Sequence, residues 1–392
     1  MSSNKKALML DAGFAAMPLL MALKHSGYET AVCSGKPQDP GHQLAAHSFC
    51  LNYANVQDVL TLAKSLNITS LLPGVTDVSY LTGASVAEAM GLRGFDRPDV
   101  AEIIFKKDVF RQWAQNKGYP VPVAVSCPEE AAQLPLPLMI KPVDSYSGLG
   151  ISLVTEREHI SAAWRDACAA SSCGQALIER WIAGDLHSHS AFIVNGKVAV
   201  EYFVDEFCTV YPWQVNSSSL SLNLPASIKD QVSDCIQALV DELGLCDGLL
   251  HTQFISDGKS FSLIEMTRRC PGDLYNQLIE YSTDTPYSLW FTHAFTGTPF
   301  TPASRRPEHV RLIARHTVSV DQEQTFTSVS FAALPANILS FLPLKKTGER
   351  IQRAPHDRAA LIFAEFHQRD ELARFTPQLK NFLRLVSTRK PI

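Results

Sequence analysis

The first hundred residues alternate short apolar runs with amphipathic stretches in the order of a β-α-β unit. Residues 7–10 predict a strand, Ala12–Gly13 a turn, and residues 17–25 a helix that ends before Gly27. Residues 29–33 return as a second strand, and a helix over 56–65 with a strand over 68–72 repeats the pattern. This order predicts a doubly wound α/β domain over residues 1–105. Loop 73–77 then follows a strand at the edge where such sheets bind ligands.

After residue 105 the pattern changes to a domain over 106–182 that mixes helices with short strands. A helix over 107–117 ends at Gly118, and Pro120 and Pro122 mark a hinge. Strands are expected over 138–141, 151–154 and 176–182. Thr155 and Glu158 form a capping-box pattern, which predicts a helix from 155 to about 170.

The remaining segment, 183–392, is expected to form a third domain. The two-residue turn Asn195-Gly196 predicts a hairpin. A helical apolar period over 228–243 stops at Gly244, and a second hairpin follows over 249–266. Beyond residue 297 the sequence predicts mixed strands and helices with no recognisable chemistry.

Composition and charge narrow the class of protein. The 392 residues carry 35 Lys+Arg and 39 Asp+Glu, a net charge of −4, which does not predict a nucleic-acid partner. A hydrophobic content of 46% without a long apolar run predicts no membrane partner. The apolar stretch up to Leu23 is interrupted by Asp11 and Pro18 and is interpreted as the β-α-β unit rather than a leader. Nine cysteines without a CxxC predict reduced thiols in a cytoplasmic protein.

Three familiar site patterns are absent or incomplete. The first turn, residues 11–16, lacks the GxGxxG spacing of a dinucleotide site. Residues 258–260 resemble the end of a P-loop but lie in a hairpin without the first glycine. His187 and His189 share one strand face, yet no third ligand has suitable spacing, so zinc is the less favoured interpretation.

Two lysines and a Ser/Gly loop form the first candidate for chemistry. Lys141 ends an apolar strand and opens the loop 142–150, whose backbone N–H groups could hold phosphate oxygens beside its ammonium group. Lys107 lies at the start of a helix, where a cation is disfavoured unless an anion lies nearby. Taken alone, Lys107 is better explained as a solvated lysine, and Ser/Gly hairpins are common.

Glu179 is the second candidate, because it lies in the apolar strand 177–182. There it could accept a hydrogen bond from the amino group of an adenine while neighbouring backbone groups complete the recognition. An ion pair with Arg180 or another base explains it equally well.

The last hairpin gives the third candidate. Glu265, Thr267 and Arg269 are spaced by two and project from one face, and His251 and Gln253 share a face of the preceding strand. Magnesium bound to nucleotide phosphates needs only one or two protein carboxylates. Arg269 could stabilise a transferring phosphoryl group. A plain Glu265–Arg269 ion pair is the alternative.

The order and spacing of these parts resemble the ATP-grasp superfamily over about residues 5–275. The matching motifs are 92–94 at the end of the first domain, 107–111 with 118–122, 137–142 with its loop to 150, 178–182, and 264–269. The resemblance implies ATP clamped between two α+β subdomains. It also implies an ATP-dependent carboxylate–amine ligase that makes an acyl-phosphate, binds small-molecule carboxylate and amine substrates, and is a homodimer. The run 251–254 resembles the amino-acid ligase and biotin-carboxylase-like branches.

Roles for individual residues follow from the resemblance alone. Catalytic roles fall to Lys141 and Arg269, and Mg²⁺ or Mn²⁺ to Glu265 with Gln253. Expected ATP-binding residues are Lys107, Lys141, Ser145, Ser147, Gly148, Gly150, Glu179, Trp181, Ile182 and, near the ribose, His187. Substrate candidates are Arg268, Asp273, Arg311 and Arg315, although such arginines are more often surface pairs.

Two positions depart from the family's pattern. The family usually has a second acidic metal ligand at the position of Gln253 and an Asn at that of Thr267. An amide keeps an oxygen ligand but removes one negative charge, so a second cation should bind more weakly. His251 or Asp273 could compensate. Otherwise the chain would be a slow enzyme or a non-catalytic nucleotide-binding protein.

Overall fold

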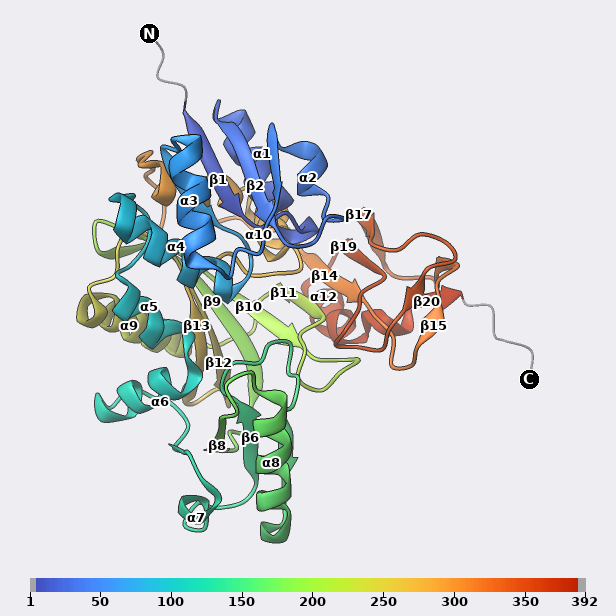
Figure 1. The fold of residues 1–392 in the computed structure, drawn as a ribbon. Helices are drawn as coiled ribbons and strands as arrows, with labels where there is room; N and C mark the ends of the chain where they lie inside the picture. The colour runs from blue at the N-terminus through green and yellow to red at the C-terminus, as the bar shows by residue number, and fades with distance from the viewer. Residues whose placement is uncertain (1–4, 387–392) are drawn as a thin grey trace.

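A four-stranded parallel sheet forms the N-terminal part of the computed structural model, which describes residues 5–386 (Figure 1). The strand order is β3-β2-β1-β4, and β1 is almost wholly buried, as its apolar residues 7–10 predict for a central strand of a parallel sheet. The elements are β1 (Lys6–Leu10), η1 (Phe14–Ala16), α1 (Met17–His25), β2 (Glu29–Ser34), α2 (Gly41–Leu44), β3 (His47–Cys50), α3 (Val56–Leu66), β4 (Ser70–Pro73) and α4 (Asp77–Met90).

The buried carboxylate of Asp11 holds two loops of this sheet together. It accepts hydrogen bonds from the backbone N–H of Gly13 at 2.8 Å and of Val75 at 3.1 Å. Gly74 makes this possible, because a Cβ at that position would lie 2.0 Å from the Asp11 Cβ. The loop after β4 is therefore fixed at the carboxyl edge of the sheet.

A small antiparallel sheet follows two connecting helices, α5 (Pro98–Phe105) and α6 (Lys107–Asn116). Its order is β5-β8-β6-β7, and α8 packs on it at the lower end of Figure 1. The elements are β5 (Ala124–Val125), α7 (Pro128–Ala131), β6 (Leu138–Pro142), β7 (Ser152–Val154), η2 (Arg157–His159), α8 (Ile160–Ala170) and β8 (Ala176–Arg180). The capping-box prediction is wrong: α8 begins only at Ile160, and no side chain caps it.

An eight-stranded antiparallel sheet runs through the centre of the molecule (Figure 1). Its order is β13-β12-β9-β10-β11-β14-β19-β17. The strands are β9 (Asp185–Val194), β10 (Lys197–Phe207), β11 (Ser217–Leu220), β12 (Gly248–Ser256), β13 (Phe261–Thr267), β14 (Ile313–Val318), β17 (Ala336–Pro343) and β19 (Ala360–Phe366). Both predicted hairpins, β9–β10 and β12–β13, are present.

Helices cover the two faces of this sheet. Helix α9 (Ala226–Leu243) packs its apolar stripe on one face, together with Phe203 and Phe254. Helices α10 (Tyr275–Thr283) and α11 (Tyr287–Thr296) cover part of the other face, where Phe192 and Tyr202 are buried. Helix α11 also packs against α1, so the core is continuous with the N-terminal sheet.

The C-terminal part extends the sheet and closes its end with short elements. Two small sheets pair β15 with β18 and β16 with β20. These elements are β15 (Gln324–Thr325), β16 (Ser328–Phe331), β18 (Arg350–Ile351), α12 (Arg369–Phe375), η3 (Thr376–Asn381) and β20 (Leu383–Val386). The mixed strands and helices predicted beyond residue 297 are confirmed.

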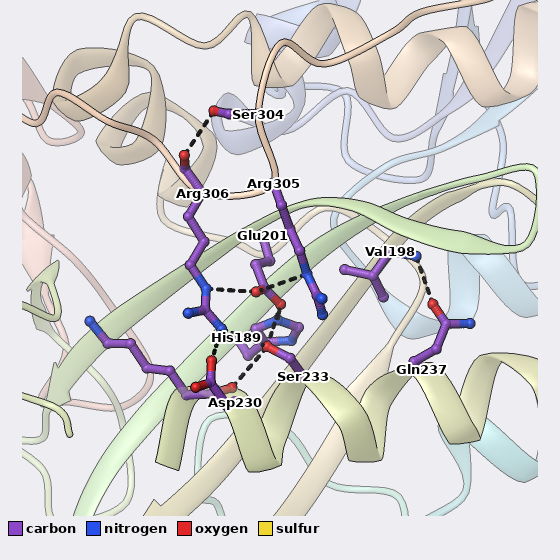
Figure 2. Close-up of polar contacts among 10 residues, drawn as sticks. His189, Val198, Glu201, Asp230, Ser233, Gln237, Ser304, Arg305 and Arg306 are labelled. Atoms are coloured by element: carbon purple, nitrogen blue, oxygen red, sulfur yellow. Dashed lines mark hydrogen bonds and ion pairs between the residues drawn. The ribbon is translucent and has the colours of Figure 1, made fainter. Parts of the chain in front are cut away.

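A buried carboxylate ties the segment after α11 to the sheet (Figure 2). Glu201 on β10 has no exposed surface and accepts from Ser233 on α9 at 2.7 Å and from Arg306 Nε at 2.8 Å, while His189 Nε2 lies 3.0 Å away. Arg305 Nε is 3.2 Å from the same carboxylate. Four segments thus meet at one charge.

All nine cysteines lie within residues 5–386, and none of them forms a disulfide. In the same range, every helix is too short or too polar to cross a bilayer.

Candidate functional site

A cavity of about 1390 Å³ lies where the three sheets meet. Its walls come from the loops after β2 and β4, the Ser/Gly loop between β6 and β7, the segment after β8 and the eight-stranded sheet. The cavity brings together most of the candidate residues: Lys107, Lys141, Ser145, Ser147, Gly148, Glu179, Trp181, Ile182, Gln253, Glu265, Arg269, Asp273 and Arg315.

One end of the cavity holds a buried cluster of three charges. Glu179 Oε1 accepts from Arg111 Nε at 2.7 Å, and its Oε2 lies 2.7 Å from Lys141 Nζ. All three side chains are at least 94% buried. Burial opposes the charged form of Glu179, but Arg111 and Lys141 outweigh it and lower the pKa of the carboxyl group. Two cations around one anion leave a net positive charge facing the cavity.

Lys107 extends this positive region to the Ser/Gly loop. Its Nζ donates to the backbone oxygen of Ser145 at 2.8 Å. Burial lowers the pKa of Lys141, and Arg111 and Lys107 act in the same direction. A bound anion would relieve this repulsion, so the arrangement is suited to phosphate groups.

The Ser/Gly loop is held against the segment that connects β10 to β11. Gly148 has φ +73°, and a Cβ there would lie 2.3 Å from the Trp213 Cβ. Tyr211 donates its hydroxyl to the Gly148 oxygen at 3.1 Å. The loop therefore covers the cavity through backbone contacts that only glycine permits.

The segment after β8 lines the same end of the cavity. Trp181 and Ile182 both contribute to the wall. The Trp181 N–H donates to the Pro137 oxygen at 3.1 Å, and the indole meets Trp213 edge to face with centroids 6.1 Å apart. This turn is thus fixed from both sides.

The opposite wall is the polar face of β12 and β13. Gln253 lies directly across from Glu265, and His251 lies across from Thr267, which confirms that these side chains share a face. Within residues 5–386 the Glu265 carboxylate has no hydrogen bond or ion pair to protein groups. A free carboxylate beside an amide oxygen suits a hard divalent cation whose other ligands are phosphate oxygens and water. The donor set fits Mg²⁺ or Mn²⁺.

Arg269 closes the cavity on the side of the N-terminal sheet. Its Nε donates to Asp77 Oδ1 at 2.8 Å, at the start of α4. The alternative of a Glu265–Arg269 ion pair is therefore wrong. Because Arg269 is only partly buried, its guanidinium keeps donors for a ligand.

Arg315 and Asp273 lie together in the wall of the cavity. Arg315, 3% exposed, donates to the Asp273 backbone oxygen at 2.9 Å and to Ser218 Oγ at 2.8 Å. Its Nε has no partner in the described part of the chain. Asp273 pairs with Arg358 Nε at 2.8 Å.

Comparison with known proteins adds relatives at low identity. No family model matches the chain. It is 22% identical over 362 residues to a formate-dependent phosphoribosylglycinamide formyltransferase of Prochlorococcus marinus (strain MIT 9515), covering 89% of this chain and 91% of the relative. A relative of the same name from Cupriavidus pinatubonensis is 25% identical over 221 residues, which is 53% of this chain and 54% of that one. Several such matches span about half of the relative.

Solved structures share the whole architecture. The L-amino acid ligase from Bacillus licheniformis has a TM-score of 0.81 at 17% identity, covering 99% of this chain and all of that one. The phosphoribosylglycinamide synthetase from Anaerococcus prevotii has a TM-score of 0.76 at 15% identity, covering 98% and 100%. The chain has the ATP-grasp fold. These relatives and neighbours belong to the carboxylate–amine ligase branch of the superfamily and are enzymes that use ATP.

Four predicted site residues do not line the cavity. Arg268 is 2% exposed and binds Asp96 and backbone oxygens in the core, so it is not a substrate residue. Arg311 is exposed and pairs with Glu365 away from the cavity. His187 pairs with Asp205 and stacks on Phe254, on the face opposite Gln253. Gly150 packs on Pro142 and Ala170 outside the cavity wall.

Sequence reasoning assigned no individual role to three residues that line or support this cavity. Arg111 lies within the motif 107–111, but its partner Glu179 is 68 residues away in the sequence. Asp77 lies in the loop expected to face a ligand, and its partner Arg269 is 192 residues away. Glu206 lines the cavity from β10. For Glu179, an ion pair is present, with Arg111 and Lys141 instead of Arg180, and its adenine role stays a prediction.

Proposed function

We propose that the chain is an ATP-dependent ligase that activates a carboxylate as an acyl-phosphate and joins it to an amine. The observation that carries the proposal is that Lys141 and Glu265 line one cavity beneath the Ser/Gly loop. A cationic end and a carboxylate-bearing wall within one cavity suit a triphosphate and its metal ion.

The nucleotide would occupy the end built by the small antiparallel sheet. Lys107 and Lys141 would contact its phosphates, with the backbone of Ser145, Ser147 and Gly148 above them. Trp181 and Ile182 would hold the adenine. Arg111 and Glu179 would keep the Lys141 ammonium in place, because both oxygens of Glu179 are engaged by these two cations.

Glu265 and Gln253 would hold Mg²⁺ or Mn²⁺ against the phosphates. A divalent cation there supplies neutralisation of the charge that develops on the transferred phosphoryl group. Arg269, with donors left after pairing Asp77, would contact the same group.

The reaction needs no protein nucleophile. A substrate carboxylate oxygen attacks the terminal phosphorus, and the bond to ADP breaks. The amine nitrogen then attacks the acyl carbon, inorganic phosphate leaves, and the nitrogen loses a proton as the amide forms. Positioning and electrostatic stabilisation account for such catalysis. The unpartnered Nε of buried Arg315 supports a carboxylate position beside that residue in the cavity.

Two further points follow from the comparisons. A non-catalytic nucleotide-binding protein, suggested by Gln253 and Thr267, is not favoured, because the relatives are named as enzymes. The names of these proteins differ in substrate, from phosphoribosylglycinamide to L-amino acids. We therefore propose the reaction class and small-molecule substrates, and a homodimer stays a prediction.

The direct test is release of ADP and phosphate over a panel of carboxylic acids and amines, with products identified by mass spectrometry. Glu265→Ala should abolish substrate-dependent release, whereas Glu158→Ala, an exposed carboxylate outside the cavity, should leave it unchanged. Substrate-dependent release that survives Glu265→Ala would contradict the metal role. ATP binding with no product from any pair would contradict ligation.

A further inference from the structure

The cavity contains a second carboxylate next to the predicted metal ligands, contributed by a different strand. Glu206 lies on β10, and its Oε2 accepts from Gln253 Nε2 at 2.6 Å. Gln253 lies across from Glu265 on one side and from Ser188 on the other. Ser188 pairs with Val204, two residues before Glu206, so all these side chains share one face.

The position of Glu206 is costly for a carboxylate. It is 6% exposed and lies near the like charge of Glu265. In cross-strand register, Ser218 lies between Glu206 and Arg315, and Arg315 is the cation that acts on it. No ion pair between Glu206 and a base is formed in the described residues, so the fold alone does not neutralise it.

The other two groups that could replace the missing charge at position 253 do not do so. His251 donates or accepts through Nδ1 with Ser190 at 2.7 Å, and an imidazole carries no negative charge. Asp273 is paired with Arg358 and accepts from Thr317. Glu206 is the cavity carboxylate that contacts Gln253 itself.

We propose that Glu206 is a positioning residue of the metal site that supplies from β10 the negative charge that Gln253 does not supply from β12. The Glu206 carboxylate accepts a hydrogen bond from Gln253 Nε2. This contact leaves the amide oxygen, Gln253 Oε1, free for a cation. No hydrogen bond among the described residues occupies that oxygen. Glu206 and Glu265 together then carry two negative charges around one amide. This inference rests on the proposed function.

The test compares Mn²⁺ affinity in the presence of a non-hydrolysable ATP analogue, read from the electron paramagnetic resonance of free Mn²⁺. The variants are Glu206→Gln, the exchange variant Glu206→Gln with Gln253→Glu, and Glu129→Gln as an exposed control outside the cavity. Glu206→Gln should weaken Mn²⁺ binding roughly 10–100-fold, as loss of a group that orients a metal ligand does. The exchange variant keeps one carboxylate and one amide at the two positions and should recover most of the affinity.

Each outcome decides whether Glu206 positions the metal site or has only a structural role. Mn²⁺ affinity within twofold of wild type in Glu206→Gln overturns the inference, as does an exchange variant no better than the single one. If Glu206 were only structural, the exchange variant would restore thermal stability without restoring Mn²⁺ affinity. Metal-free binding of a fluorescent ATP analogue is measured in parallel. Nucleotide binding without a Glu206 effect overturns this inference alone, whereas no nucleotide binding by wild type overturns the proposed function as well.

Discussion

Glu179→Gln tests the charge cluster at the nucleotide end of the cavity. Glu179 is the only anion in contact with both Arg111 and Lys141 in the described structure, and all three side chains are buried. The substitution keeps the size of the side chain and removes its charge. It leaves two buried cations, with Lys107 nearby, without a counter-ion.

The expected loss of stability is large. Removing one partner of a buried ion pair costs roughly 3–5 kcal/mol, because the other partner stays buried and uncompensated. Glutamine can still accept one of the two hydrogen bonds, so we expect a loss near the lower limit, about 3 kcal/mol. With a shift of roughly 2–4 °C per kcal/mol for a domain of this size, the unfolding midpoint should fall by roughly 6–12 °C.

ATP should act on the variant with a definite sign. Its phosphates supply negative charge to the same cations, so ATP with Mg²⁺ should raise the midpoint of Glu179→Gln by more degrees than that of the wild type. Thermal unfolding followed by circular dichroism, with and without nucleotide, measures both effects. Glu158→Gln is the matched control, because it makes the same change at an exposed site.

Two results would refute this reasoning. A midpoint for Glu179→Gln within 2 °C, or about 1 kcal/mol, of the control would show that the buried cations do not depend on the carboxylate. An equal ATP shift in variant and wild type would show that the phosphates do not reach this cluster.

Three other predictions follow. Gly148→Ala places a Cβ 2.3 Å from the Trp213 Cβ at φ +73°, so the Ser/Gly loop cannot close; kcat should fall at least tenfold at saturating ATP without loss of overall stability. Asp96→Asn leaves buried Arg268 unpaired and should lower the free energy of unfolding by roughly 3 kcal/mol, while KM for ATP is unchanged because the pair lies outside the cavity. Glu201 has its pKa lowered to about 2, despite burial, by His189, Ser233 and Arg305, so its contribution, on the order of 3 kcal/mol, is present above the ordinary value near 4.5. That contribution is lost as pH falls towards 2, and Glu201→Gln should flatten the acid branch of a stability–pH curve.

Local patterns predicted most of the regular structure. The helix over 17–25 has the predicted bounds, and the hairpin at Asn195-Gly196 forms because both residues take positive φ, 52° and 70°. Gly244 ends α9 in the left-handed conformation, as the sequence indicates. These features depend on residues a few positions apart. The same is true of the array on β13, where alternation alone places Glu265 and Thr267 on one face.

Errors arose where the answer depends on register or on a distant partner. Alternation already puts Arg268 on the face opposite Thr267 and Arg269, so its exclusion from the site was within reach of the sequence. His187 is different: whether it faces Gln253 or Phe254 depends on the pairing of β9 with β12, which no local pattern specifies. The Thr155–Glu158 box failed because Glu156 precedes a short 3₁₀ turn and the helix begins later.

The distribution of charge in the cavity supports the proposal that a divalent cation binds at this site. Arg111, Lys141 and Lys107 outnumber Glu179 at one end, which favours the phosphates of a nucleotide. The wall opposite bears Glu206 and Glu265, and two carboxylates without a cation would repel the terminal phosphate. A divalent cation would neutralise the two carboxylates, so the wall would no longer repel the triphosphate that the other end attracts. The proposed metal site therefore predicts that the total negative charge of the wall matters, so that a carboxylate on β10 replaces one on β12.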